Sequence, residues 1–239
     1  MLTINGREVL QTIEELVDPK HTALLVVDVQ KDLAYPGGYL DRRGGAHHPM
    51  AAVLPNIAEA VQAARQAGVL VVYLHHTVAP DHRSHTGPWI RYYTRGLKYD
   101  PDNYGCVENT WGWEICDEVK PQPGDIVVPK MRPSGFVGTP LQLILQQHGV
   151  KTVVVCGYAT EACVASTVRD ALWYEYHSVP LLDCMGSNDP ECAGIWLEML
   201  EKGSSLKLDG LKAIWAAKPS ASTDKSSAEA SVPRCASAG

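Results

Sequence analysis

Short apolar runs alternate along this chain with segments whose apolar residues have helical spacing. The runs cover residues 23–27, 69–74, 126–128, 151–156 and 179–182. Continuous runs rich in β-branched residues are typical of strands that are buried on both faces of a parallel sheet. Helical spacing is clear in residues 50–67 and 190–202. The alternation therefore predicts an α/β domain in which helices cover both faces of a parallel sheet.

This domain is expected to span residues 1–217, with shorter helices near residues 9–16 and 110–119. Residues 77–110 form a long polar stretch with many His, Arg and Tyr side chains, and a loop of this length is usually functional. Residues 218–239 are rich in Ser, Ala and Lys and contain almost no large apolar side chain. Such a segment cannot bury enough surface to offset the entropy lost on ordering, so we expect a flexible tail.

The composition excludes several classes of protein. The net charge of −6 offers no basic surface to a nucleic acid. No apolar segment approaches the length of a transmembrane helix, so we expect no membrane partner. The N-terminus lacks the charged start and apolar core of a signal peptide. The seven cysteines are an odd number and include no CxxC pair, which indicates reduced thiols and a cytoplasmic protein.

The most reactive candidate is Cys163, in the segment CGYATEACVAST (residues 156–167). An apolar run leads into this segment, a turn follows, and Cys163 falls in the first turn of the next helical pattern. Unpaired N–H groups and a positive dipole at a helix start stabilise a thiolate, so the pKa of Cys163 is expected to be lowered. The same N–H groups can bind an oxyanion. The alternative is a cysteine that only packs in the core.

Two further charged residues follow the ends of predicted strands. Asp28 follows the first run, Lys130 follows the third, and Cys163 follows the fourth. Ligands of such folds bind outside the carboxyl ends of the strands, so the three side chains are expected to converge. Together they supply a general base, a cation and a nucleophile. Taken singly, Asp28 could only form a turn and Lys130 could be a solvated loop residue.

The sequences around these residues resemble the isochorismatase-like family of cysteine hydrolases over about residues 20–200. The similar segments are LLVVDVQKDL around Asp28, VVPKMRPSGF around Lys130 and VVVCGYATEACVAS around Cys163. The resemblance implies a three-layer α/β/α fold with a mainly parallel sheet of about six strands. It also implies an Asp28–Lys130–Cys163 triad, a cis peptide between Tyr158 and Ala159, and an oxyanion hole made by the N–H groups of Ala159 and Cys163.

Within the family, the chain is similar to the N-carbamoylsarcosine amidase, biuret hydrolase and ureidoacrylate amidohydrolase side. Residues 37–39, Gly-Gly-Tyr after the first strand, resemble that group. The resemblance implies a cysteine-dependent amidohydrolase that cleaves a small carboxamide or N-carbamoyl (ureido) compound. The reaction would pass through a thioester, release ammonia and need no cofactor.

Other functions stay open at this point. One is an isochorismate-type vinyl ether hydrolase, and another is a nicotinamidase. The metal pattern of the nicotinamidase branch, aligned to end at His82, puts His76 and Val78 at the first two ligand positions, and valine cannot ligate a metal. We therefore expect no metal, although His75, His76, His82 and His85 form a group whose composition suits zinc.

Two further readings lie outside this chemistry. A non-catalytic binding protein could use the same fold, but the intact triad weighs against it. A thiol redox protein would need a resolving cysteine, and Cys156 lies within a predicted strand, which is poor geometry for that partner.

Substrates in this group often carry a carboxylate, which an arginine can bind through two hydrogen bonds. The candidates are Arg83, Arg91, Arg95 and Arg132, and we favour Arg83 and Arg91, inside the long loop. Tyr35, Trp89 and Tyr158 are expected to wall the pocket. We also expect a homo-oligomer, either dimer or tetramer, with part of residues 77–110 at an interface.

Overall fold

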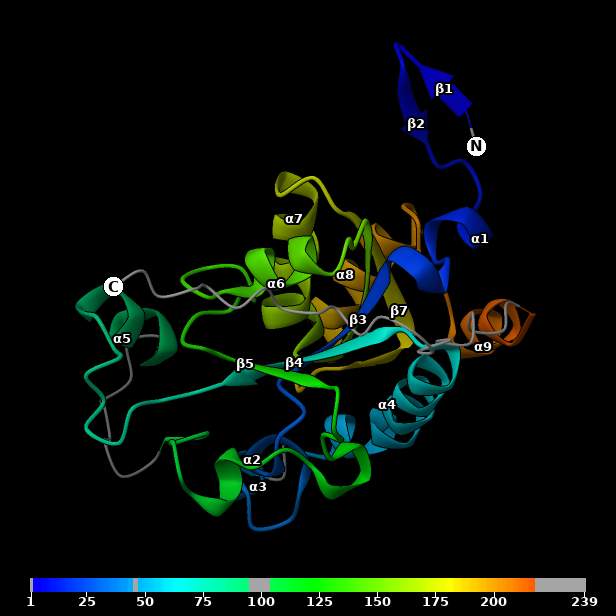
Figure 1. Ribbon diagram of the computed structural model, residues 1–239. Coiled ribbons are helices and arrows are strands. Elements are labelled where there is room, and N and C mark those ends of the chain that lie inside the picture. Colours follow the sequence, from blue (N-terminus) through cyan, green and yellow to red (C-terminus); the bar gives the residue numbers. More distant parts are fainter. Residues whose placement is uncertain (1, 45–46, 95–103, 218–239) are drawn as a thin grey trace, which may run out of the picture.

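A computed structural model of the chain describes residues 2–44, 47–94 and 104–217. Its core is a five-stranded sheet in the order β5-β4-β3-β6-β7, and all of its neighbouring strands are parallel. The strands are β3 (Thr22–Val27), β4 (Leu70–His76), β5 (Ile126–Lys130), β6 (Thr152–Tyr158) and β7 (His177–Gly186). Helices cover both faces (Figure 1), so the three-layer α/β/α prediction is confirmed. Where a sixth strand was expected, the described residues have a single bridge between Leu181 and Leu206.

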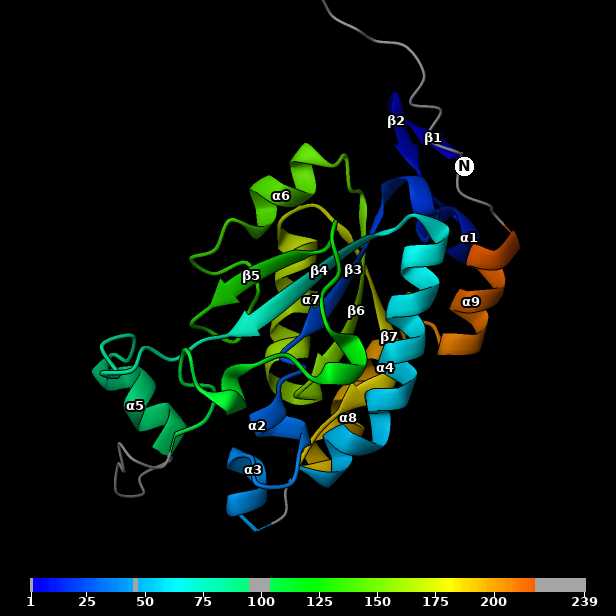
Figure 2. The same cartoon turned by 60° about the horizontal axis from the view of Figure 1, so that its bottom comes forward.

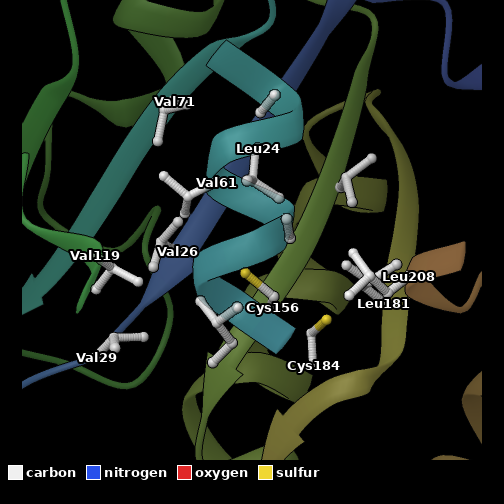
Figure 3. Close-up of a cluster of buried hydrophobic side chains, with 14 of the residues drawn as sticks. Leu24, Val26, Val29, Val61, Val71, Val119, Cys156, Leu181, Cys184 and Leu208 are labelled. Carbon is white, nitrogen blue, oxygen red and sulfur yellow. The ribbon is translucent and has the colours of Figure 1, made fainter. Parts of the chain in front are cut away.

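One face of the sheet packs against α4 (His48–Ala67) and α9 (Leu208–Ala217). The central strand β3 is buried along its whole length, and its Leu24 and Val26 face this layer together with Cys156 of β6. Figure 3 shows these side chains against α4. Gly68 ends α4 in the left-handed conformation that glycine adopts without strain.

The opposite face packs against α6 (Leu141–Gln147) and α7 (Ala165–Trp173). Alternate residues of β3, Ala23, Leu25 and Val27, face this second apolar cluster. The helix α8 (Pro190–Glu201) adds Leu197 and Leu200 to the edge of the cluster. Because successive strand residues point to opposite faces, an uninterrupted apolar run is what a strand between two helical layers requires.

The N-terminal region differs from the prediction. The expected helix over residues 9–16 is present only as α1 (Ile13–Leu16), because an antiparallel hairpin of β1 (Leu2–Ile4) and β2 (Arg7–Val9) precedes it. Figures 1 and 2 show this hairpin projecting away from the sheet. The indole N–H of Trp215 in α9 donates to the carbonyl oxygen of Val17 at 2.9 Å, which joins the last helix to this region.

Short elements lie beyond the carboxyl ends of the strands: α2 (Lys31–Ala34), α3 (Tyr39–Arg42) and α5 (Gly87–Thr94). The helix expected over residues 110–119 is instead two 3₁₀ turns, Trp111–Trp113 and Asp117–Val119. The predicted tail lies outside the described residues, as does Arg95. No helix of the described segments is long and apolar enough to cross a membrane.

The strand order places a topological switch point beside β3. The chain leaves β3 toward β4 and β5 on one side and later returns to form β6 on the other side. Loops that diverge at such a point open a crevice at the carboxyl ends of the strands. Gly157 of β6 is pressed against β3 here, since a Cβ on this residue would lie 2.1 Å from the Val27 carbonyl oxygen.

Candidate active site

Asp28, Lys130 and Cys163 meet at this switch point. Asp28 directly follows β3 and holds a left-handed conformation with φ 53°, which Asp tolerates better than most residues. Lys130 ends β5, and its Nζ donates to Asp28 Oδ2 at 2.8 Å and to the Arg132 carbonyl oxygen at 3.2 Å. The side chains of Lys130 and Asp28 are 0% and 3% exposed, so water is almost excluded from the pair.

The electrostatics tie Cys163 to this pair. Burial alone would lower the pKa of Lys130, but the nearby Asp28 and Cys163 reverse the effect and raise it, so Lys130 is a cation. Burial raises the pKa of the Cys163 thiol to about 12, and the Asp28 carboxylate contributes in the same direction while Lys130 opposes it. The sequence predicts that the helix start lowers the pKa of Cys163. The pKa is instead raised, so that prediction is wrong.

The raised pKa of Cys163 determines the protonation state of the site at rest. At neutral pH Cys163 is a thiol beside an ion pair, because desolvation of a thiolate outweighs the helix start and the cation together. One carboxylate oxygen, Asp28 Oδ1, is buried without a hydrogen-bond donor in the described part of the chain. A thiol proton is the kind of donor that such an oxygen lacks. The arrangement can therefore deprotonate Cys163 when a substrate binds.

Cys163 is held by a tight turn rather than by a regular helix start. It lies in a π-helical turn, Thr160–Val164, which leads directly into α7. The Thr160 hydroxyl donates to the Gly186 carbonyl oxygen at 3.2 Å, and the Thr167 hydroxyl donates to that of Cys163 at 2.7 Å. Insertions of this type are frequent at functional sites because they re-aim one side chain.

The backbone before this turn carries the features expected of an oxyanion hole. The Tyr158–Ala159 peptide is cis, at the position that the family resemblance implies. The Ala159 N–H makes no hydrogen bond to another described residue, whereas its carbonyl oxygen accepts from Ala162 and Val164. A free donor N–H close to a nucleophile is suited to bind developing negative charge.

A cavity of about 430 Å³ opens over the triad. Asp28 and Cys163 lie in its wall with Tyr158 and Ala159. Trp89 lines it too, so two of the predicted pocket aromatics, Trp89 and Tyr158, do face the site. A volume of this size suits a small molecule.

Three predicted substrate-binding residues do not line this cavity. Arg83 is exposed and pairs with Asp81 at 3.2 Å, and Arg91 is exposed on α5. The Tyr35 hydroxyl is engaged elsewhere, where it donates to Glu118 and accepts from the Asp117 N–H. The position of Arg83 and Arg91 inside the long loop, and that of Tyr35 after the first strand, gave no information on the direction of the side chains.

The cavity also has polar wall residues that the sequence prediction missed: Tyr39, Arg43, His76, Glu161 and Asn188. The Arg43 guanidinium donates to the Tyr39 hydroxyl at 2.6 Å, and the Tyr158 hydroxyl donates to Asn188 Oδ1 at 2.8 Å. Burial, together with the charge of Lys130, lowers the pKa of His76 to about 4, so this ring is neutral at pH 7. Tyr39 and Glu161 stood in quoted segments and His76 in the histidine group, but none of the five was predicted to bind substrate.

The buried carboxylate of Asp32 organises the loops around the cavity. It accepts hydrogen bonds from the N–H groups of Tyr39 at 2.8 Å and Cys106 at 2.7 Å. Gly112 packs directly on it, because a Cβ there would lie 2.1 Å from the Asp32 carboxyl carbon. One side chain thus joins the segment after β3 to residues 106–112, which are more than 70 residues away in the sequence.

The histidines do not assemble a metal site. Among residues 2–44, 47–94 and 104–217, no three His, Cys, Asp or Glu side chains are placed to hold one ion. His82 and His85 stack with ring centroids 5.5 Å apart, and the His75 ring stacks on Trp113 at 4.3 Å. Val78, which lies between His76 and His82 in the sequence, is buried, and its side chain has no atom that can bind a metal.

Comparison with known proteins adds a family and several related structures. The family model described as the Isochorismatase domain matches residues 22–205. A cysteine hydrolase from Pseudomonas syringae pv. phaseolicola 1448A is 27% identical, with a TM-score of 0.73, and the match covers 85% of this chain and 96% of that one.

Two amidases of known structure are also similar. For the N-carbamoylsarcosine amidase from Thermoplasma acidophilum, the identity is 26% and the TM-score 0.62, with 79% of this chain and 97% of that one covered. For the pyrazinamidase of Pyrococcus horikoshii in complex with zinc, the identity is 30% and the TM-score 0.63, with 78% and 98% covered.

Proposed function

Because the chain belongs to the isochorismatase family, we propose that it is a cysteine-dependent amidohydrolase that acts on a small carboxamide or N-carbamoyl compound. The observation that carries this proposal is the placement of one thiol beside a buried carboxylate–ammonium pair at the wall of a cavity. This set contains a nucleophile, a base that can also return a proton, and a fixed positive charge.

In the proposed reaction, Asp28 takes the proton of the Cys163 thiol as the thiolate attacks the substrate carbonyl carbon. The N–H groups of Ala159 and Cys163 bind the oxyanion of the tetrahedral intermediate. Asp28 then gives its proton to the leaving nitrogen, the C–N bond of the tetrahedral intermediate breaks, and ammonia departs to leave the thioester. Asp28 next accepts a proton from water, the hydroxide attacks the thioester, and the thiol is restored as the acid is released.

Lys130 holds the Asp28 carboxylate in position beside the thiol. Its Nζ donates to Asp28 Oδ2 at 2.8 Å, and its positive charge opposes part of the rise in the thiol pKa. Lys130 is thus proposed as a positioning and electrostatic residue rather than as a proton donor.

The amidase proposal is favoured over a vinyl ether hydrolase by the thiol itself. Protonation of a vinyl ether needs an acid but no nucleophilic sulfur, whereas attack on an amide carbonyl needs both nucleophile and proton return. It is favoured over a zinc-dependent amidase by the buried Val78, which has no ligand atom, and by the lack of a three-ligand group in the described residues. The relatives above include an N-carbamoylsarcosine amidase and a pyrazinamidase in complex with zinc.

An ammonia-release screen tests the proposal. The substrates are N-carbamoylsarcosine, N-carbamoyl amino acids, biuret, ureidoacrylate, maleamate and nicotinamide, each with and without EDTA, and isochorismate is followed separately. We expect an acyclic amide or ureido compound to be hydrolysed in EDTA and Cys163→Ala to abolish turnover. Turnover of isochorismate alone, or nicotinamide turnover that EDTA removes and zinc restores, would contradict it.

We further propose that the enzyme works in the cytoplasm as a homo-oligomer. The six cysteines within the described ranges are free thiols, which suits a reducing compartment. Light scattering at micromolar concentration tests the assembly, because a 26.0 kDa particle would show a monomer.

A further inference from the structure

We propose that Glu161 makes this site selective for substrates that carry a cationic group close to the scissile carbonyl. The inference rests on the proposed amidohydrolase function and names its substrate class. It departs from the expected carboxylate clamp, because Arg83 and Arg91 lie outside the cavity wall.

The first observation is the position of Glu161. It belongs to the π-helical turn that presents Cys163, two residues before the thiol, and it lines the same cavity. Its charge acts on Tyr158, whose pKa is raised by burial and by Glu161. A ligand group bonded to the carbon that Cys163 attacks would therefore lie close to this carboxylate.

The second observation is that this charge is uncompensated. Glu161 Oε2 is buried with no hydrogen-bond donor, and Glu161 forms no ion pair within residues 2–44, 47–94 and 104–217. The start of the π-helical turn offsets part of the charge through the backbone dipole. The side chain as a whole is half-buried. A carboxylate oxygen that is buried without a donor is unfavourable, and a ligand ammonium or amidinium group would supply the missing hydrogen bond.

The other charges of the cavity wall do not neutralise Glu161. Asp28 is already paired with Lys130 at 2.8 Å. The Arg43 guanidinium donates to the Tyr39 hydroxyl and lies 5.5 Å from the centroid of that ring, on an exposed part of the rim. His76 is neutral at pH 7 because burial and Lys130 lower its pKa. The inner wall near Cys163 is therefore negative, and an anionic substrate group would be repelled there.

Three carboxamides of similar size and different charge test the inference. Glycinamide carries an ammonium group, propanamide is neutral, and malonamate carries a carboxylate. At pH 6.5 the amine of glycinamide is protonated, since an α-amino group has a pKa of about 7.7–8.0. We expect kcat/KM to be highest for glycinamide, and Glu161→Gln to reduce the glycinamide to propanamide ratio by about 10-fold to 100-fold, the effect of one hydrogen bond to a charged group.

Two variants control for charge. Glu198→Gln removes the same charge from an exposed position on α8, outside the cavity wall, and should leave the substrate ratio at the wild-type value. Arg43→Gln removes the cation at the rim and should shift the ratio in the opposite direction to Glu161→Gln. Circular dichroism verifies folding, and Glu161→Ala repeats the test if Glu161→Gln is not folded.

A second readout does not depend on turnover. Cys163 is treated with the cationic reagent 2-aminoethyl methanethiosulfonate or the anionic reagent 2-sulfonatoethyl methanethiosulfonate, and its labelled peptide is followed by mass spectrometry. In each case the thiolate forms a mixed disulfide and methanesulfinate leaves. We expect the cation to anion rate ratio to fall at least about 10-fold in Glu161→Gln.

The two readouts separate the two proposals. If no carboxamide or ureido compound is hydrolysed but the reagent ratio falls in Glu161→Gln, the amidohydrolase function is overturned and the cation preference of the cavity is upheld. If amides are hydrolysed but neither ratio changes in Glu161→Gln, the function stands and the selectivity of Glu161 is overturned.

Discussion

The Nζ atom of Lys130 lies 2.8 Å from Oδ2 of Asp28, and both side chains are almost fully removed from water. An ion pair in this setting contributes little net stability, because desolvation of both charges offsets their attraction. Each charge nevertheless depends on the other, since removal of one leaves the second buried without a partner. This dependence can be measured.

Lys130→Met should lower the free energy of unfolding by about 3–5 kcal/mol, because it leaves the Asp28 carboxylate buried and unpaired. The double variant Asp28→Asn/Lys130→Met should recover part of this loss, since neither buried charge remains. Urea unfolding measures both. The matched control is Lys212→Met, which breaks an exposed pair with Glu59 at 2.6 Å and should change the stability far less, because solvent screens both charges. Equal losses for the two lysines would show that burial of the pair is unimportant.

Asp28→Asn should make Cys163 easier to alkylate while it abolishes turnover. Burial and the Asp28 carboxylate both raise the thiol pKa, whereas Lys130 lowers it. Removal of the carboxylate therefore lowers the pKa from about 12, and the rate of iodoacetamide labelling at pH 8–9 should rise. Lys130→Met should act in the opposite direction. An unchanged labelling rate in both variants would show that the three side chains do not titrate as a unit.

His76 should make the protein less stable as the pH falls from 6.5 to 4. Its pKa is about 4 in the folded state, lowered first by burial and then by Lys130, against 6.5 in the unfolded chain. Between these values the unfolded state binds the extra proton, so stability rises with pH there and is constant below about 4 for this group. The full effect is at most about 3 kcal/mol. Urea unfolding across this range should show a smaller slope for His76→Gln than for wild type.

Gly157→Ala should destabilise the protein by about 3 kcal/mol or more and lower turnover with it. Its Cβ would lie 2.1 Å from the Val27 carbonyl oxygen, and its φ of 121° disfavours a side chain. Gly194→Ala provides the control, because nothing lies within 4 Å of a Cβ at this position in α8. That change should stabilise by about 1 kcal/mol through helix propensity. Thermal unfolding of the two variants gives the comparison, and a stable Gly157→Ala would refute the close approach of β6 to β3.

The layered fold could be predicted because each strand of the main sheet contains a short apolar run. The ends of the strands could not be predicted, because polar residues continue the hydrogen-bonded pairing beyond the apolar run. His75 and His76 pair with Pro129 and Lys130 inside the sheet, although they look like loop residues in the sequence. The backbone of His76 is also held by the Gln30 side chain, which donates to its carbonyl oxygen at 3.0 Å and accepts from its N–H at 2.9 Å. Such tertiary contacts leave no periodic signal.

The apolar runs also allowed the catalytic triad to be predicted, but not the wall of the cavity. Asp28, Lys130 and Cys163 follow apolar runs, so the rule for parallel sheets brings them together. The wall of the cavity comes from segments without periodicity, such as Arg43 after α3 and Asn188 before α8. The raised thiol pKa depends on burial of Cys163, which a sequence position at a helix start does not specify.

The pairing of β3 with β6 makes catalytic competence a late event in folding. Residues 22–27 meet residues 152–157, so most of the chain forms a loop that must close before this ladder exists. Asp28 and Cys163 lie just beyond the carboxyl end of these paired strands. In a chain whose β6 has not yet paired with β3, the turn that carries Cys163 is not positioned beside Asp28. A nascent or partly unfolded molecule therefore lacks the assembled site, and recovered activity reports the completed sheet rather than local structure.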